Sequence, residues 1–529
     1  MYWYWVLEKK KNYKKSSRRN QQGNRQDKMK KKTKATVVIR IFIVLIIVAM
    51  LWKELSILLI PSSYNNVDSM AKVVMKKTST PGVAMVISRQ GQLEYKCYGY
   101  ADVKHEKKIN EESLFEIGST TKAFTALAII LLEEEGYLSG SDCVTDYISW
   151  FTPTYNGKHE KITINQLLAH TSGIPPWSIR LIPEGTKANM LERTIRNIST
   201  INLESYPGTK HNYATVNYDI LALIIEKITG ERFQDFVTDN ILLPLGMTES
   251  YFSTGHEKIS NNLTKGYKAF FGNSVEYRAP RYNGNIAAGY LVTNVKDLGL
   301  WMNAQLGVGD IPVKLKRAID KSHVVDKESA GYEELNKYYS YGWNHDTKNG
   351  VISHSGSNPN YSSQVIMNIE KQEAIFVLAN LDSSAPTQIA YNTYKNMNGK
   401  KMSKFGYNDT YLLLDMIFSV LSTIVLVSFC FKLINWALGR KKLAKVENVK
   451  TGTLERSIIV LFLKIILLII IIIWPYFMNY SYYVIKVWMS NAILVWEGLA
   501  VIDCVLAIIT ELRTITENQN VEIMGCDLL

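Results

Sequence analysis

Long apolar runs stand at both ends of the chain, whereas apolar and polar positions alternate through its middle. The first run is Val37–Trp52, and three others follow at Tyr411–Ile434, Ile458–Pro475 and Tyr483–Leu512. A helix needs roughly 20 apolar residues to cross about 30 Å of hydrocarbon, and each run reaches or approaches that length. The pattern therefore predicts four membrane-spanning segments, the first of them within residues 35–60.

Residues 66–400 have the mixed pattern of a folded domain. Two segments, Val83–Arg89 and Leu93–Tyr98, flank a short glycine-containing turn and predict a β-hairpin. Lys122–Glu135 and Asp219–Thr229 have the apolar spacing of helices, and a glycine follows each as a stop signal. Strand-like segments return near the end, at Val351–Ser355, Ser363–Asn368 and Ala374–Asn380. We therefore expect an α+β domain whose antiparallel sheet pairs its first strand with its last.

The net charge of +13 is concentrated in two places. Residues 1–34 carry 13 Lys and Arg against two acidic residues, a net of +11, and residues 439–456 carry a net of +4. The rest of the chain is therefore close to neutral, at about −2. Basic segments beside apolar helices follow the positive-inside rule, so we expect both in the cytoplasm and no nucleic-acid partner.

Together these patterns predict how the chain is organised in a cell membrane. The expected order is a basic cytoplasmic tail (1–34), a signal-anchor or transmembrane segment (35–60), an extracytoplasmic domain (66–400), three transmembrane helices (411–434, 458–475 and 483–512) with a cytoplasmic loop (439–456), and a cytoplasmic tail (513–529). Membrane lipids are thus expected partners, and the helices offer a route to a homo-oligomer.

Ionisable residues within these apolar runs are costly in a membrane and often functional. We expect Asp415 and Lys464 to lie near an interface or to pair with each other. Glu497 and Asp503 lie in the last run, where contact with substrate or with a partner helix would explain them.

Cysteine and histidine patterns suggest neither a disulfide scaffold nor a metal centre. Five cysteines are few for 529 residues, and Cys97 and Cys143 are the only candidates for an external bridge. No CxxC, HExxH or His/Cys cluster occurs in the sequence, so we expect no metal and no cofactor.

A candidate nucleophile lies at the start of the first predicted helix, where Gly118 precedes the motif Ser119-Thr-Thr-Lys122. Three residues make nearly one helical turn, so the serine and the lysine share a face. A serine hydroxyl is a poor nucleophile until a base takes its proton, and a buried lysine of lowered pKa can be that base. The helix N-terminus also places the Ser119 amide where it can bind an oxyanion.

Two further motifs follow in order along the chain. Tyr213, in the sequence YATVNYD, offers a phenol that could relay a proton from the serine to the leaving group. His354 and Gly356 belong to an HSG motif on a predicted strand, whose edge could line a substrate channel. The amide of Ser357 could then supply a second oxyanion donor.

This ordered set of motifs resembles the active sites of class C β-lactamases, low-molecular-mass penicillin-binding proteins and related esterases. The resemblance spans roughly residues 68–395 and includes LAHTSG at 168–173, PLGM at 244–247 and AGYL at 288–291. It implies a β-lactamase/transpeptidase-like serine hydrolase domain, with an antiparallel sheet flanked by helices and an all-helical part. It also implies an acyl-enzyme on Ser119.

A closer resemblance is to the membrane-bound peptidases that activate prodrugs in nonribosomal-peptide pathways, such as those maturing colibactin, zwittermicin and xenocoumacin. Those enzymes also have an outer serine peptidase followed by three membrane helices, and they remove an N-acyl-D-asparagine cap from an exported precursor. By this resemblance Asn358 contacts the D-Asn side chain. Thr215 stands where the colibactin enzyme has a serine, and Asn285 stands where it has a histidine that binds the cap.

Three kinds of function fit these observations. The first is a D-amino-acid-specific peptidase that acts on an acylated peptide or small-molecule precursor of an antibiotic or toxin. The second is a penicillin-binding-like D,D-carboxypeptidase, esterase or β-lactamase, which would use the same catalytic residues. The third is a non-enzymatic sensor, immunity factor or scaffold, and the intact set of Ser119, Lys122 and Tyr213 argues against it.

Overall fold

The computed structural model describes residues 64–255, 260–325, 331–334, 336–406, 409–437, 453–477 and 481–526, with isolated positions between 37 and 60. The predicted N-terminal segment 35–60 therefore lies largely outside the described residues. Residues 57–415 and 482–491 form one compact unit, which we call the catalytic unit. The long C-terminal helices belong to a second unit, the helical unit.

A nine-stranded antiparallel sheet forms the centre of the catalytic unit, in the order β11-β12-β13-β14-β15-β16-β1-β2-β3. Its first long strand, β1 (Gly82–Arg89), pairs with its last, β16 (Glu373–Ala379), with Val83 opposite Ala379. The other strands are β2 (Gln92–Asp102), β3 (Lys107–Lys108), β11 (Gly331–Glu334), β12 (Lys337–Ser340), β13 (Trp343–Asp346), β14 (Val351–Asn358) and β15 (Tyr361–Asn368). The predicted hairpin and the predicted pairing of first and last strands are confirmed.

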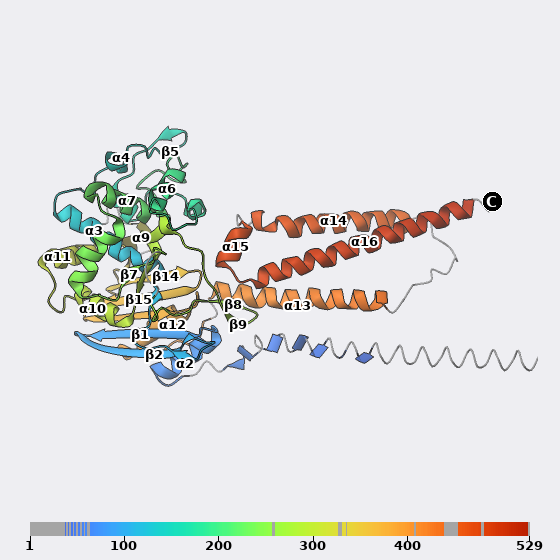
Figure 1. Cartoon of the computed structure of the whole chain (residues 1–529), viewed down its shortest axis with the longest axis horizontal. Coiled ribbons are helices and arrows are strands. Elements are labelled where there is room, and N and C mark those ends of the chain that lie inside the picture. Colours follow the sequence, from blue (N-terminus) through green and yellow to red (C-terminus); the bar gives the residue numbers. More distant parts are fainter. Residues whose placement is uncertain are drawn as a thin grey trace, which may run out of the picture. The chain divides into compact units, whose positions relative to one another are not determined.

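Helices cover both faces of this sheet (Figure 1). The sequence of β1 requires this, because its apolar side chains point alternately to the two faces. Val83 and Met85 point into a cluster with α2 (Val67–Lys77) and α12 (Ala385–Met397). Ala84, on the opposite face, belongs to the main core. Because side chains on a strand alternate between faces and both faces are covered, every residue of β1 up to Ile87 is buried.

The main core joins the sheet to the helical part of the unit. The long helices here are α3 (Lys122–Glu134), α7 (Val216–Thr229), α10 (Val295–Gln305) and α11 (Val313–Ser322). Shorter elements are β4 (Phe115–Glu116), η1 (Gly118–Thr121), α5 (Ile164–Leu168), α6 (Met190–Asn197), β8 (Tyr267–Phe270), β9 (Asn273–Glu276), η5 (Asn283–Asn285), α9 (Ile286–Gly289) and β10 (Leu291–Thr293). Phe124 of α3 stacks on Trp301 of α10, with ring centres 4.7 Å apart. The two predicted helices are confirmed, and Gly230 ends α7 in a left-handed conformation with φ +74°.

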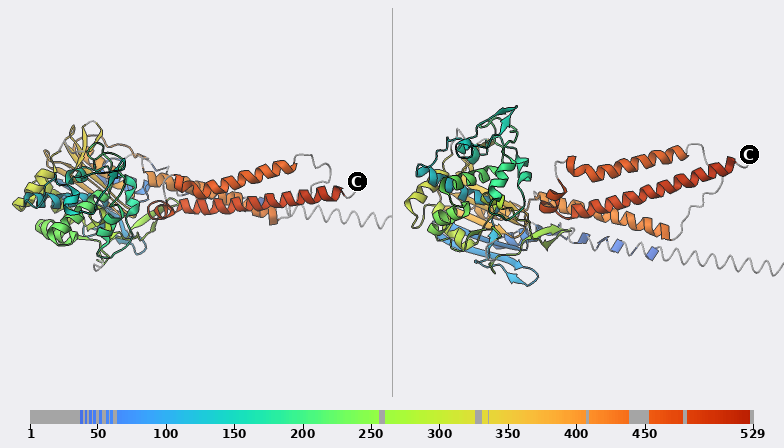
Figure 2. Two further views of the ribbon diagram at one scale, coloured as in Figure 1. Left: turned by 90° about the horizontal axis from the view of Figure 1, so that it is seen from above. Right: turned by 45° about the horizontal axis from the view of Figure 1, so that its top comes forward.

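Three helices among the described residues are long and apolar enough to cross a membrane. They are α13 (Thr410–Ala437), α14 (Thr453–Phe477) and α16 (Ala492–Cys526), and they run side by side in all views (Figures 1 and 2). Within this unit Lys432 of α13 pairs with Asp503 at 2.7 Å, and Lys464 of α14 pairs with Glu511 at 2.6 Å. The suggested pair of Asp415 and Lys464 does not form.

The last apolar run is not one continuous helix, which corrects the predicted crossing at 483–512. Residues Tyr482–Trp488 form a separate short helix, α15, and α16 begins only at Ala492. Ile485 and Val487 of α15 are buried, and α15 belongs to the catalytic unit. Their apolar side chains therefore serve packing against protein, where the sequence pattern alone suggested contact with lipid.

Candidate active site

Ser119 and Lys122 meet where the turn η1 passes into α3. The lysine Nζ lies 2.9 Å from Ser119 Oγ, and it donates a hydrogen bond to the Ala288 carbonyl at 2.8 Å. Lys122 is fully buried, whereas Ser119 remains partly exposed. The arrangement therefore presents the hydroxyl to a ligand while the amine is held behind it, away from water.

Two glycines let strand β14 approach the serine turn closely. A Cβ added to Gly118, which has φ +56°, would lie 2.5 Å from the Ser357 nitrogen. A Cβ added to Gly356 would lie 1.9 Å from the Ile117 carbonyl oxygen. Because no side chain fits between them, the backbones of η1 and β14 run against each other. This contact places the amides of Ser119 and Ser357, the two predicted oxyanion donors, on adjoining stretches of backbone.

Tyr213 stands on the other side of the lysine. Lys122 Nζ lies 5.2 Å from the centre of the Tyr213 ring. The Tyr213 hydroxyl is buried and has no hydrogen-bond partner among the described residues. A buried hydroxyl without a partner is costly, so this group is available to exchange a proton with a bound substrate.

His170, in the LAHTSG segment, packs against the ring of Tyr213. Its ring centre lies 4.1 Å from that of Tyr213, and its backbone has a left-handed φ of +55°. His170 Nδ1 accepts hydrogen bonds from the Ala214 amide at 3.3 Å and from Asn217 Nδ2 at 2.9 Å. The segment was recognised in the sequence, but this supporting role depends on tertiary contacts that no spacing rule reveals.

Two histidines beside Lys122 are held neutral. Burial lowers the pKa of His170 well below its usual range, and the nearby charge of Lys122 lowers it further. Burial and then the Lys122 charge lower the pKa of His354 to about 3. His354 Nε2 lies 3.0 Å from the Tyr339 hydroxyl, and Nδ1 lies 2.6 Å from the Ser355 carbonyl. The ring is thus fixed on β14 by both nitrogens and is nearly inaccessible.

Asp219 is a buried carboxyl near the lysine, on the first turn of α7. Burial raises the pKa of Asp219 well above its usual range, and the charge of Lys122 opposes that shift. Neither carboxyl oxygen has a hydrogen-bond partner among the described residues. Desolvation outweighs the attraction here because an unpaired buried carboxylate is expensive, so burial favours the neutral form of Asp219.

The predicted substrate-binding residues lie in two hydrogen-bonded groups. Thr215 Oγ1 donates to Asn285 Oδ1 at 3.3 Å. Asn358 Nδ2 donates to Glu116 Oε2 at 2.7 Å and to the Gly289 carbonyl at 2.9 Å. Glu116 was not predicted, because a lone acid on a short strand carries no signal in a sequence. The same short helix, α9, therefore supplies carbonyls to both Lys122 and Asn358.

The segment that leads into α9 is bound by α15. Tyr483 of α15 donates to Glu184 Oε2 at 2.5 Å, and its hydroxyl lies 2.8 Å from that of Tyr282. The Gly185 amide donates to the Arg281 carbonyl at 2.8 Å, so the two segments that Tyr483 touches are themselves joined. Lys268 Nζ donates to the Lys486 carbonyl at 2.6 Å, which fixes α15 at a second point.

Comparison with known proteins gives concordant matches. A family model described as Beta-lactamase matches residues 67–396, a stretch that contains every predicted site residue. Protein flp of Staphylococcus aureus (strain COL) is 32% identical over 381 residues, covering 70% of this chain and 75% of flp. Putative penicillin-binding protein PbpX of Bacillus subtilis (strain 168) is 35% identical over 184 residues, covering 35% of this chain and 44% of PbpX.

Solved structures share the fold. The octameric penicillin-binding protein homologue from Pyrococcus abyssi matches with a TM-score of 0.55 and 26% identity, over 66% of this chain and 80% of that one. A class C beta-lactamase matches with a TM-score of 0.54 and 20% identity, over 63% of this chain and 96% of that one.

Proposed function

This chain belongs to the beta-lactamase family of serine hydrolases, and from that premise we propose that it is a membrane-bound peptidase specific for an N-acyl-D-asparagine cap. It would hydrolyse the amide bond that follows the cap on an acylated peptide or small-molecule precursor of an antibiotic or toxin. The observation that carries the proposal is Asn358, held beside the serine turn by Glu116 and the Gly289 carbonyl. A fixed carboxamide is a suitable partner for the side-chain amide of a D-Asn.

The chemistry proceeds through an acyl-enzyme. Lys122 takes the proton of Ser119, whose Oγ attacks the carbonyl carbon of the D-Asn residue. The amides of Ser119 and Ser357 stabilise the oxyanion, each donor lowering the barrier by about 3–4 kcal/mol. Tyr213 delivers a proton to the leaving amine, and the amide bond breaks. Lys122 then passes the proton that it took from Ser119 on to Tyr213. Water attacks the ester carbonyl and gives a proton to Lys122, the acyl–serine bond breaks, and Lys122 returns that proton to Ser119 Oγ.

The membrane helices support an acylated substrate and an extracytoplasmic site. A lipid-tailed cap would partition into the bilayer, which concentrates it near an enzyme that α13, α14 and α16 anchor there. The basic segment at 439–456 joins α13 to α14, so it lies across the membrane from the chain ends that enter the catalytic unit. The positive-inside rule then supports the proposal that the catalytic unit lies outside.

The test uses membranes that carry the full chain. They are incubated with an N-myristoyl-D-Asn amide or with its L-Asn counterpart, and the products are identified by mass spectrometry. Membranes that carry the Ser119→Ala variant are the control. Release of myristoyl-D-Asn alone, abolished in Ser119→Ala, supports the proposal. Failure to cleave either amide rejects the D-Asn specificity.

A second function is favoured by the names of the relatives. PbpX is described as a putative penicillin-binding protein, and one structural match is a class C beta-lactamase. The same membranes should therefore be offered D-Ala-D-Ala peptides, esters and β-lactams. Turnover of one of these without cleavage of the D-Asn amide would favour a D,D-carboxypeptidase, esterase or β-lactamase.

A further inference from the structure

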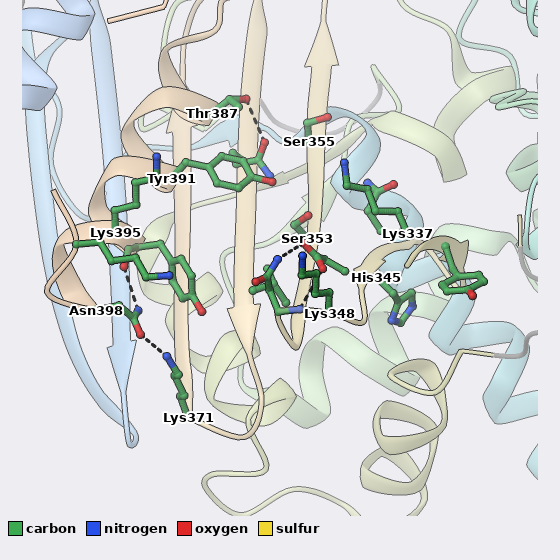
Figure 3. Close-up of a pocket in the computed structure, with 18 residues that line it drawn as sticks. Lys337, His345, Lys348, Ser353, Ser355, Lys371, Thr387, Tyr391, Lys395 and Asn398 are labelled. Carbon is green, nitrogen blue, oxygen red and sulfur yellow. Dashed lines mark hydrogen bonds between the residues drawn. The ribbon is translucent and has the colours of Figure 1, made fainter. Parts of the chain in front are cut away.

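An open groove of about 770 Å³ lies on the face of the sheet opposite the catalytic serine. Alternation along β14 separates the two faces: Ile352 and His354 are buried toward the main core, while Ser353 and Ser355 point into the groove. Tyr391 and Lys395 of α12, with Asn398 just after this helix, line one side, and Lys337 and His345 line the other (Figure 3).

Positive charge dominates this groove. Its lysines are Lys337, Lys348, Lys371, Lys395 and Lys400, and its single lining carboxylate is Asp346. The chain outside its two basic segments is close to neutral, so such a local excess is not a reflection of overall composition. Burial lowers the pKa of His345 to about 4, so this histidine adds no charge at neutral pH.

Four of these lysines form no ion pair with a residue that the structure describes: Lys348, Lys371, Lys395 and Lys400. Lys371 donates to Asn398 Oδ1, and Lys395 donates to Ser403 Oγ at 2.6 Å, so both have neutral acceptors. Asp346 accepts a hydrogen bond from Asn349 Nδ2 at 2.7 Å. The groove therefore keeps an uncompensated field that attracts anions.

The floor and walls add neutral hydrogen-bonding and aromatic groups. Ser353, Ser355 and Asn344 offer hydroxyl and carboxamide groups, and Tyr391 and Tyr394 offer exposed or half-buried rings. Amides and hydroxyls bind the hydroxyl groups of a polyol, and aromatic rings cover its apolar faces. A simple inorganic anion could use the hydroxyls and the carboxamide but would have no use for the aromatic rings.

We propose that this groove binds an anionic, hydroxyl-rich chain, namely a sulfated, phosphorylated or carboxylated polysaccharide or polyol polymer. Binding here leaves Ser119 free, because the serine lies across the sheet. The site would hold the catalytic unit against such a polymer while the active site works on its own substrate.

The experiment measures binding of the full chain in neutral phosphatidylcholine nanodiscs to three probes. Dextran sulfate carries charge and hydroxyls, dextran carries hydroxyls only, and polyphosphate carries charge only. We expect dextran sulfate to bind at least tenfold more tightly than either of the others, with an affinity that falls as salt rises. Equal binding of polyphosphate or of dextran would overturn the assigned ligand class.

Variants then locate the site. Lys348→Gln with Lys395→Gln removes two of the five groove lysines, and the matched control is Lys104→Gln with Lys158→Gln, two exposed lysines outside the groove. The groove pair should weaken dextran sulfate binding at least tenfold, and the control pair less than twofold, with unchanged melting temperatures. An equal loss in both pairs would show general charge attraction and reject the groove.

Discussion

Lys122 shows how single residues divide the work of the site. Its amine is fully buried between Ser119, the Ala288 carbonyl and the Tyr213 ring, and its charge helps keep His170 and His354 neutral. The lysine therefore stands among groups that burial keeps neutral. Asp219 fits this view because burial raises the pKa of its carboxyl, which favours the neutral form.

Asp219→Asn should therefore leave turnover nearly unchanged and stabilise the protein. The folded pKa of Asp219 is raised above the unfolded value, so the wild type loses stability as pH rises above about 4. The neutral amide avoids that loss. Melting temperatures between pH 4 and 8 should show a gain at neutral pH that vanishes toward pH 4. A variant that is less stable and inactive at pH 7 would mean that Asp219 is ionised and pairs with Lys122.

At this scale the sequence predicted the residues that carry motifs. Ser119 and Lys122 meet as their spacing requires, and Tyr213 lies beside them although about 90 residues separate it from the serine. Glu116 and the role of His170 were not predictable. Their functions depend on Asn358 and Ala214, which only the folded chain brings within hydrogen-bond distance.

Close contact between two elements, η1 and β14, is needed to pair the predicted oxyanion donors. Gly356→Ala would force a Cβ to within 1.9 Å of the Ile117 carbonyl, and backbone cannot yield as a flexible side chain does. We expect a loss of about 1–3 kcal/mol of stability from this overpacking, together with loss of acylation. Chemical denaturation and labelling of Ser119 by a fluorophosphonate would measure the two effects. Labelling at the wild-type rate would contradict the need for this contact.

Helix α15 should act on substrate binding through Tyr282. Tyr483→Phe removes hydrogen bonds to Glu184 and Tyr282, and the segment after Tyr282 carries Asn285 and the Ala288 carbonyl. Each lost bond is worth about 0.5–1.5 kcal/mol, so KM should rise severalfold while kcat changes less. Tyr137→Phe, at an exposed phenol elsewhere in the unit, is the control. Equal changes in both variants would exclude a positioning role.

Periodicity predicted several elements of the fold but not α15. The hairpin β1–β2 and helices α3 and α7 follow from alternation, helical spacing and glycine stops. In α15 the apolar residues adjoin those of α16, so the sequence shows one run. Only the folded chain, in which Ile485 and Val487 are buried and α15 belongs to the catalytic unit, distinguishes a short docked helix from the start of a membrane crossing.

For the whole molecule, the proposed topology makes a direct prediction. A cysteine placed at Lys158 of the catalytic unit, in a chain whose own cysteines are replaced, should react with an impermeant maleimide on intact cells. A cysteine at Lys445, in the basic segment between α13 and α14, should react only after permeabilisation. Labelling of Lys445→Cys on intact cells would show that the orientation is the reverse of the proposed one. The fold and the three helices were predicted from motifs and apolar runs. The side of the membrane on which the catalytic unit lies is predicted from charge alone.

The docking of α15 also bears on how the enzyme could be released from a cell. Helix α15 is held by the Lys268–Lys486 contact, by Tyr483 and by two buried aliphatic side chains. These contacts do not depend on the chain that leads from α12 into α13. A surface protease that cut the chain within residues 398–406 would break the connection through α13, but the catalytic unit would still be bound to α15. Such a nicked enzyme should stay with the cell pellet and remain active, so shedding into the medium would demand several cuts.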